Sequence, residues 1–192
     1  MKNYWMQTYT GKKFDLLNPK VEDVDIIDIA HSLSMQCRYN GHTLKFYSVA
    51  EHCVHVMNCL PTNLRLAGLL HDAAEAYVGD CISPLKTMLS SFKGIEFRIL
   101  EVIAKAFSCE EVICNDYIKQ VDLDILKDEH EQAMIPGLEW HTEGRGTGCL
   151  LLQFWTPEEA KSEFLSAFWR YVDVDIKKSI PYYQPPEREI FE

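Results

Sequence analysis

Apolar residues recur at helical spacing over most of the chain. Residues 24–35, for example, place Ile26, Ile29 and Leu33 on one face. No stretch alternates apolar and polar residues as a strand does, and no segment repeats. The pattern therefore predicts an all-α fold, with residues 1–24 irregular. The predicted helices cover residues 24–35, 47–60, 62–78, 92–107 and 112–134, and a last helix begins at Pro157.

Three of these helices have recognisable capping residues. Ser48 is the expected N-cap of the second helix, and Glu51, three positions on, completes a capping box. Gly79 is placed to end the third helix. Residues 156–159 (TPEE) combine an N-cap, a proline at the first helical position and a capping-box glutamate. Glu51 is accordingly interpreted as structural.

Residues 69–80, LLHDAAEAYVGD, place three chemically active side chains in an apolar helix. His71 and Glu75 are four positions apart, so a continuous helix would project them from one face, with Asp72 beside them. An imidazole and a carboxylate are costly to bury unless they are paired or bound to a cation. The segment is either a satisfied core histidine with its carboxylate or half of a metal site, and further ligands decide between the two.

Candidate ligands stand on two other predicted helices. His52 lies on the preceding helix, and Asp122 lies on a later helix whose apolar face includes Ile118 and Ile125. Two imidazoles and two carboxylates suit Mn, Co, Fe, Ni, Zn or Mg rather than calcium. Spacing alone does not choose among the competitors, which are His31, His55, Asp124 and Asp128.

Composition limits the classes of partner. The 192 residues carry a formal charge of −10, so the chain has no general attraction for DNA, RNA or an anionic membrane. The length suits one domain, with a core over about residues 22–173 and an extended tail over 174–192. A small polyanionic substrate is compatible with this charge, because a metal ion and a few local cations can hold it.

The sequence also indicates a compartment. No uncharged run approaches the roughly 18 residues of a membrane span, and the first residues lack the apolar core of a signal peptide. The seven cysteines include no Cys-x-x-Cys pair. They are expected to be reduced thiols in a cytoplasmic protein.

Two loops concentrate positive charge in this acidic chain. Residues 37–46 contain Arg38, His42 and Lys45, and residues 139–149 contain His141 and Arg145. For both loops, the alternative to a functional role of these cations is an ordinary solvated loop.

Several of these stretches together resemble one enzyme superfamily. The motifs are RYNGHT, YSVAEH and HDAAEAYVGDCISPLK, and then Asp122 followed by Leu126 and Glu129. They are similar to the HD-domain metal-dependent phosphohydrolases, above all to the small bacterial 5′-deoxynucleotidases and phage dATP triphosphohydrolases. The similarity runs from about Trp5 to Tyr171 and implies one helical HD domain.

The resemblance implies a role for each matching residue. The metal ligands would be His52, His71, Asp72 and Asp122. Glu75 would be the catalytic carboxylate, with Asp80 a second catalytic group on the sugar side or positioning water. The substrate-binding residues would be Arg38, Tyr39, His42 and Lys86, with Arg38 and Lys86 on the phosphates.

Two departures refine this expectation. Relatives that bind two metals need extra histidines between the His-Asp pair and the last aspartate, and this chain has none between Asp72 and Asp122. One tightly bound divalent ion is therefore expected, any second ion arriving with the substrate phosphates. Tyr39 stands where close relatives often carry Trp or Phe, which leaves base and sugar preference open.

The resulting functional hypothesis is hydrolysis of deoxynucleotide 5′-phosphoesters. The cations of the two basic loops, together with Lys86, favour a dNTP, with dATP as the candidate, giving deoxynucleoside and triphosphate. The alternatives are a 5′-deoxynucleotidase acting on dNMPs and, from another class, an inactive HD-like scaffold for binding or assembly. The missing histidines disfavour a cyclic-nucleotide phosphodiesterase. A homo-oligomer, either dimer or hexamer, is expected.

Overall fold

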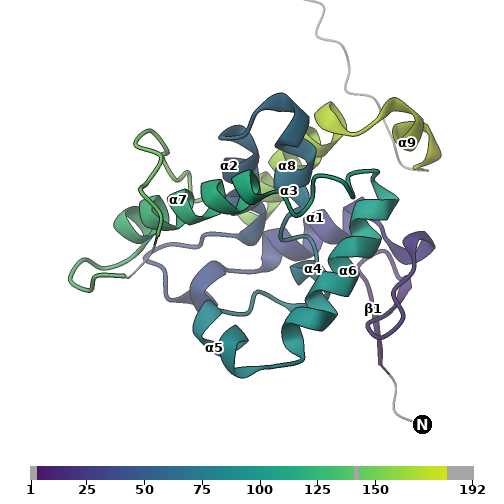
Figure 1. The fold of residues 1–192 in the computed structure, drawn as a ribbon, viewed down its shortest axis with the longest axis horizontal. Helices are drawn as coiled ribbons and strands as arrows, with labels where there is room; N and C mark the ends of the chain where they lie inside the picture. Colours follow the sequence, from purple (N-terminus) through teal and green to yellow (C-terminus); the bar gives the residue numbers. More distant parts are fainter. Residues whose placement is uncertain (1–3, 141–142, 181–192) are drawn as a thin grey trace, which may run out of the picture.

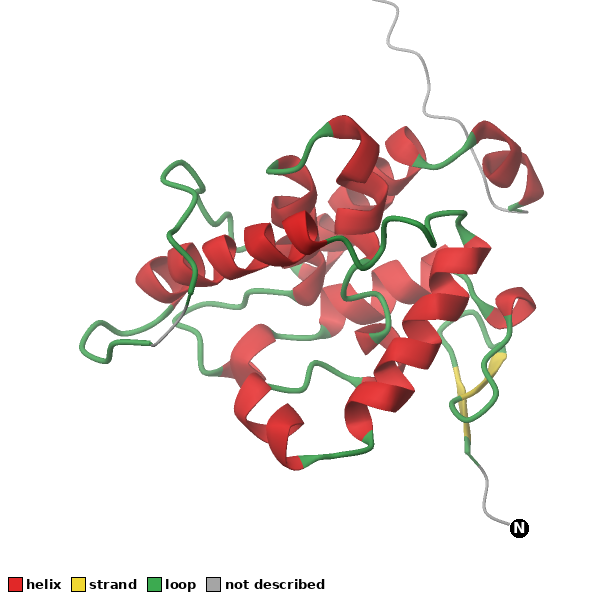
Figure 2. Cartoon of the chain, in the orientation of Figure 1, coloured by secondary structure: helices red, strands yellow, loops and turns green. Residues whose placement is uncertain are grey.

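The protein is built almost wholly of helices, which confirms the predicted fold class (Figures 1 and 2). The computed structural model describes residues 4–140 and 143–180. The one departure within them is an antiparallel hairpin, formed by β1 (Trp5–Gln7) and β2 (Lys13–Asp15). The amino-terminal segment is thus more ordered than the sequence indicates, and Phe14 carries it into the core, where its ring stacks on Tyr77.

The helical elements follow one another with short connections. In chain order they are η1 (Val21–Asp23), α1 (Ile26–Met35), η2 (Arg38–Gly41), α2 (Val49–Asn58), η3 (Thr62–Leu64), α3 (Arg65–Leu70), α4 (Glu75–Val78), α5 (Ser83–Met88), α6 (Phe92–Ala106), α7 (Asp116–Ala133), α8 (Pro157–Tyr171) and α9 (Val174–Ser179).

The capping predictions hold with one exception. The Ser48 side chain caps α2, Thr156 and Glu159 form a complete capping box at α8, and Gly79 ends α4 with a φ of 83°. The exception is Glu51, which does not reach back to Ser48. Its carboxylate instead accepts backbone hydrogen bonds from residues 153–155 and ties that segment to α2. Its structural role remains.

The prediction of one continuous helix over 62–78 is wrong, because the helix is interrupted. The chain forms η3 and α3, passes through a turn at residues 71–74 and resumes as α4. Within the turn the backbone bonds span three residues, from Ala73 N to Leu70 O and from Glu75 N to Asp72 O. Three residues per turn rotate Glu75 away from the direction of His71, because four steps no longer return to the same face.

The core lies between α1, α2, α3 and α8, and α7 packs on α2. Fully buried side chains such as Leu33, Leu69 and Phe164 fill it. Gly68 allows α3 to approach α2 closely, since a Cβ at this position would lie 2.1 Å from the Leu60 Cδ1 atom. Burial of this apolar layer fixes the helices that carry the candidate ligands.

Other boundaries differ from the predictions. The helix expected from residue 112 begins at Asp116, because Asn115 caps it. The tail expected to be extended over 174–192 forms α9 first, and residues 181–192 lie outside the described part. All seven cysteines are free thiols, as expected. Among the described helices, none has the length and apolar character needed to cross a membrane.

Candidate metal centre

Four predicted ligands converge from three segments. His52 comes from the middle of α2, His71 and Asp72 from the turn after α3, and Asp122 from the second turn of α7. The Nε2 atom of His52 lies 3.3 Å from that of His71, 3.6 Å from Asp72 Oδ2 and 3.1 Å from Asp122 Oδ1. The Nε2 atom of His71 lies 3.2 Å from Asp72 Oδ2 and 3.9 Å from Asp122 Oδ1.

The hydrogen bonds of the two histidines direct their lone pairs inward. His52 donates its Nδ1 hydrogen to Glu129 Oε1 at 2.6 Å, and His71 donates its own to the Gly68 carbonyl at 2.8 Å. In these tautomers, assigned from the hydrogen-bond partners, both Nε2 atoms carry a lone pair. Two lone pairs and two carboxylate oxygens then face one another, which is unfavourable unless a proton or a metal ion lies between them.

The donor set fits a transition-metal ion. Metal–ligand bonds of about 2.1 Å place ligand atoms about 3.0–3.4 Å apart in octahedral or tetrahedral geometry, close to the spacings found here. His52, His71 and Asp72 therefore form a group that could hold a metal ion. Imidazole with carboxylate suits Mn, Co, Fe, Ni or Zn and does not suit calcium.

The pKa shifts within the cluster show that its carboxylates are stabilised in their ionised form. Burial opposes a charge on His71, but the adjacent Asp72 carboxylate outweighs it and raises the pKa of His71. For Asp72, burial likewise opposes ionisation, but His71 and then His52 and Arg38 outweigh burial and lower its pKa. His52, through its hydrogen bond, likewise lowers the pKa of Asp122 against burial. The cluster is arranged to hold ionised carboxylates beside a positive charge.

The four competing residues all lie elsewhere. His31 stacks on Tyr9, with ring centroids 3.7 Å apart, and His55 pairs with Glu51. Asp124 accepts hydrogen bonds from Gln120 and from the backbone of Arg145, and Asp128 accepts two from Thr147.

Glu129 is a site residue that the sequence analysis did not assign a role. It is fully buried beneath His52, and four side chains donate hydrogen bonds to its carboxylate. It lies seven residues after Asp122, which places both on one helical face, so its spacing did contain a signal. Burial opposes its ionisation, but Arg38 and His52 outweigh burial and lower its pKa. The four donors are Arg38, Tyr39, Tyr47 and His52.

The predicted substrate-binding turn is held against this carboxylate. Arg38 is 9% exposed, donates to Glu129 at 2.9 Å and lies 3.8 Å from Asp72. Tyr39 has a φ of 56°, in the left-handed region that non-glycine residues rarely adopt. His42 is exposed, and within the described residues no hydrogen bond or ion pair joins its ring to the cluster. The structure thus brings Arg38 and Tyr39 to the centre and leaves His42 outside.

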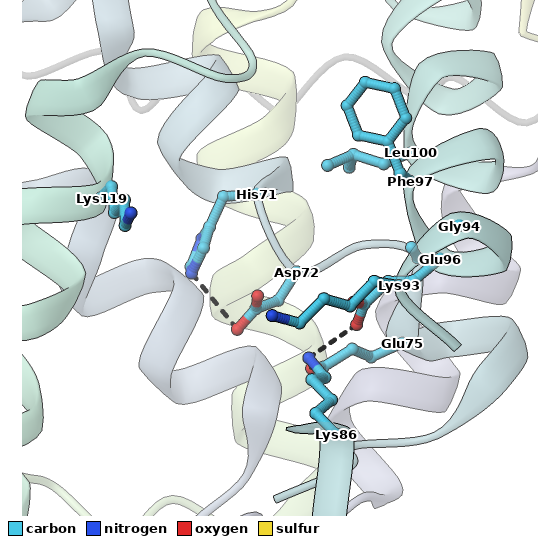
Figure 3. Close-up of a pocket in the computed structure, with 11 residues that line it drawn as sticks. His71, Asp72, Glu75, Lys86, Lys93, Gly94, Glu96, Phe97, Leu100 and Lys119 are labelled. Carbon is cyan, nitrogen blue, oxygen red and sulfur yellow. Dashed lines mark hydrogen bonds and ion pairs between the residues drawn. The ribbon is translucent and has the colours of Figure 1, made fainter. Parts of the chain in front are cut away.

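Glu75 faces a lysine instead of the histidines. Its Oε1 atom lies 3.3 Å from Lys86 Nζ, which also pairs with Glu96 of α6 at 2.7 Å (Figure 3). Its Oε2 atom is buried with no hydrogen-bond partner in the described part of the chain. Burial, followed by the charges of Asp72 and Asp80, outweighs Lys86 and raises the pKa of Glu75 to about 9. Glu75 therefore favours its protonated form at neutral pH in the absence of a metal ion.

Asp80 is the other predicted catalytic residue. Its backbone N–H donates to the Gln36 side chain at 2.9 Å, and its carboxylate makes no hydrogen bond to the described residues. Burial raises its pKa; the charge of Arg38 opposes this and that of Asp72 adds to it. Its carboxylate is thus free to meet a ligand or water.

A pocket of about 740 Å³ opens beside His71 and Asp72 and extends toward α6 (Figure 3). Helix α6 forms one wall of it. Three lysines line the pocket: Lys86, Lys93 and Lys119. Lys45 and Arg145, which the sequence favoured, do not line it, and His141 lies outside the described residues. Lys93 and Lys119 make no ion pair within the described chain.

The fold and this cluster define a helical protein with a buried histidine–aspartate group able to hold a metal ion. The chain is 38% identical over 125 residues to the uncharacterized protein YfdR of Escherichia coli, a match covering 65% of this chain and 70% of YfdR. It therefore belongs to the same family as YfdR. It is also 41% identical over 123 residues to the uncharacterized protein RCAP_rcc00048 of Rhodobacter capsulatus, covering 59% of this chain and 63% of that protein. No model of a known protein family matches the chain.

Proposed function

We propose that this protein is a metal-dependent phosphohydrolase of the HD-domain type that cleaves deoxynucleotide 5′-phosphoesters. The observation that carries the proposal is the meeting of His52, His71 and Asp72 at spacings that suit one shared ion, with Asp122 Oδ1 3.1 Å from His52 Nε2. We infer that all four are ligands, with Asp122 completing the group. The lysine-lined pocket beside them supports a phosphate-bearing substrate.

The residues around the centre suit ester hydrolysis. A divalent ion held there would supply a water of lowered pKa and would polarise a phosphoryl oxygen. Glu75 would take a proton from the attacking water, since a metal ion nearby would favour its ionised form. It then passes that proton to the leaving 5′ oxygen. Lys86 is placed to neutralise phosphoryl oxygens as charge develops, and Arg38 can do so from the other side.

The pocket favours a triphosphate over a monophosphate. A single phosphate needs few cations beyond the metal, whereas Lys86, Lys93 and Lys119 offer three, two of them free of carboxylates in the described chain. Attack of water at the α-phosphorus breaks the bond to the nucleoside 5′ oxygen. The products are then deoxynucleoside and triphosphate, and dATP is the candidate substrate.

A panel of dNTPs and dNMPs, each assayed with Mn²⁺, Co²⁺, Mg²⁺ and Zn²⁺, tests the proposal. The expected result is release of triphosphate from a dNTP, with the Glu75→Gln variant as the inactive control. Release of phosphate from dNMPs alone would replace the substrate with a nucleoside monophosphate. Absence of turnover with every nucleotide and ion would overturn the proposal.

A further inference from the structure

We propose that Glu129 is a positioning residue that joins the metal centre to the Arg38–Tyr39 turn, so that ion binding and substrate binding depend on one carboxylate. The metal half of this inference rests on the histidine–aspartate cluster alone, whereas the substrate half rests on the proposed function.

The two oxygens of Glu129 serve different partners. Oε1 accepts from His52 Nδ1 at 2.6 Å and from the Tyr47 hydroxyl at 2.8 Å. Oε2 accepts from Arg38 Nη2 at 2.9 Å and from the Tyr39 hydroxyl. One oxygen therefore faces the candidate ligand, and the other faces the candidate substrate turn.

The first oxygen sets the direction of His52. A carboxylate that accepts the Nδ1 hydrogen fixes the imidazole tautomer and turns the Nε2 lone pair toward Asp72 and Asp122. It also makes the ring a better donor to a cation. Because His52 is fully buried, no solvent water can replace this contact.

The second oxygen stabilises an unusual backbone. Tyr39 and Asn40 both adopt left-handed conformations, with φ of 56° and 52°, and Gly41 follows at 77°. Such residues persist only where their surroundings hold them. The bond from Tyr39 and the ion pair from Arg38 both end on Glu129, and Arg38 Nε has no partner of its own within the described residues. Without Glu129 the turn would lose both of these contacts and would keep only the longer ion pair from Arg38 to Asp72, at 3.8 Å.

The variant Glu129→Gln separates these roles, because the amide keeps the shape of the side chain but offers one acceptor oxygen in place of two. That oxygen can serve His52 or the turn, but not both. The matched control is Glu51→Gln. Glu51 is an equally buried glutamate that accepts three backbone hydrogen bonds away from the cluster.

The primary measurement is Co²⁺ affinity, titrated against a competing chelator with no nucleotide present. Glu129→Gln is expected to bind Co²⁺ about 10–100-fold more weakly, and Glu51→Gln is expected to match the wild type. Circular dichroism checks that both variants fold. Equal Co²⁺ affinity in the folded Glu129→Gln variant and the wild type would overturn the inference.

The second measurement is the KM of the nucleotide that the wild type cleaves, at saturating Co²⁺. Glu129→Gln should raise this KM about tenfold, and Tyr39→Phe should raise it without changing Co²⁺ affinity. If the wild type cleaves no nucleotide while Glu129→Gln still loses Co²⁺ affinity, the proposed function fails and the positioning role at the metal stands. If Glu129→Gln does not fold, the double variant Tyr39→Phe/Tyr47→Phe removes one donor from each oxygen. Unchanged Co²⁺ affinity and KM in that variant would overturn the inference.

Discussion

His52 and His71 face each other through their Nε2 nitrogens. Their Nε2 atoms lie 3.3 Å apart, while each ring donates its Nδ1 hydrogen away from the other, to Glu129 and to the Gly68 carbonyl. Hydrogen-bond partners on the outer side therefore determine what the inner side can bind.

Asp122→Ala should lose both the ion and the activity. Asp122 Oδ1 lies 3.1 Å from His52 Nε2 and 3.9 Å from His71 Nε2, so its removal leaves three ligands from two neighbouring segments. We expect Co²⁺ affinity to fall by more than about 100-fold, since even residues that only support ligands cost 10–100-fold. Asp124→Ala is the control on the same helix and should retain both properties. Undiminished metal content in Asp122→Ala would show that Asp122 is not a ligand.

Glu75→Gln should retain the ion and lose turnover. Glu75 does not contact the ligand atoms in this structure but pairs with Lys86 at 3.3 Å. General acid–base catalysis is typically worth about 10²–10⁴-fold, so kcat should fall by that factor. Metal analysis and steady-state kinetics on one preparation provide the check. Native turnover would remove Glu75 from the mechanism.

The metal-free protein should lose stability as the pH rises from 4.5 toward 9, and Glu75→Gln should reduce that loss. The folded pKa of Glu75 is about 9, against 4.5 for an unperturbed glutamate, so in this window the folded chain keeps a proton that the unfolded chain releases. Folding therefore becomes less favourable with rising pH. Each pKa unit of this shift that Glu75→Gln removes stabilises the folded protein by about 1.4 kcal/mol, which corresponds to about 3–6 °C in Tm.

Calorimetry in the presence of a chelator measures this effect. The Tm of Glu75→Gln should exceed that of the wild type at pH 8 and equal it at pH 4. The same Tm difference at both values would contradict a raised pKa for Glu75.

The lysines of the pocket should distinguish long from short phosphate chains. Lys93→Ala combined with Lys119→Ala is expected to raise the KM for dATP about tenfold, because two charge-assisted contacts are lost. The KM for dAMP should change little. Lys105→Ala is the control, since Lys105 is exposed on α6 and does not line the pocket. An equal change in KM for dATP and dAMP would show that Lys93 and Lys119 do not bind the additional phosphates of dATP.

Periodicity predicted the helices well where local signals were strong. Thr156 with Glu159, and Gly79, mark ends that depend only on neighbouring residues, and the structure has them there. The break at residues 71–74 has no such local mark, because His, Asp and Ala all suit a helix. The break could therefore not be derived from spacing.

Some of the candidate ligands could likewise be predicted from the sequence, and others could not. His71 and Asp72 stand out in an apolar run, but the choice of His52 over His55, and of Asp122 over Asp124, depends on which way each helix faces its neighbour. Lys93 and Lys119 reach the site only through tertiary packing and carry no motif. The expected homo-oligomer stays a prediction that light scattering can check.

Anomalous diffraction from crystals grown with Mn²⁺ or Co²⁺ tests the shared ion most directly. The expected map contains one strong peak about 2.0–2.2 Å from His52 Nε2, His71 Nε2 and one carboxylate oxygen each of Asp72 and Asp122. A protein that binds the ion elsewhere, or shows no peak among these four side chains at saturating metal, would contradict a metal centre at this position.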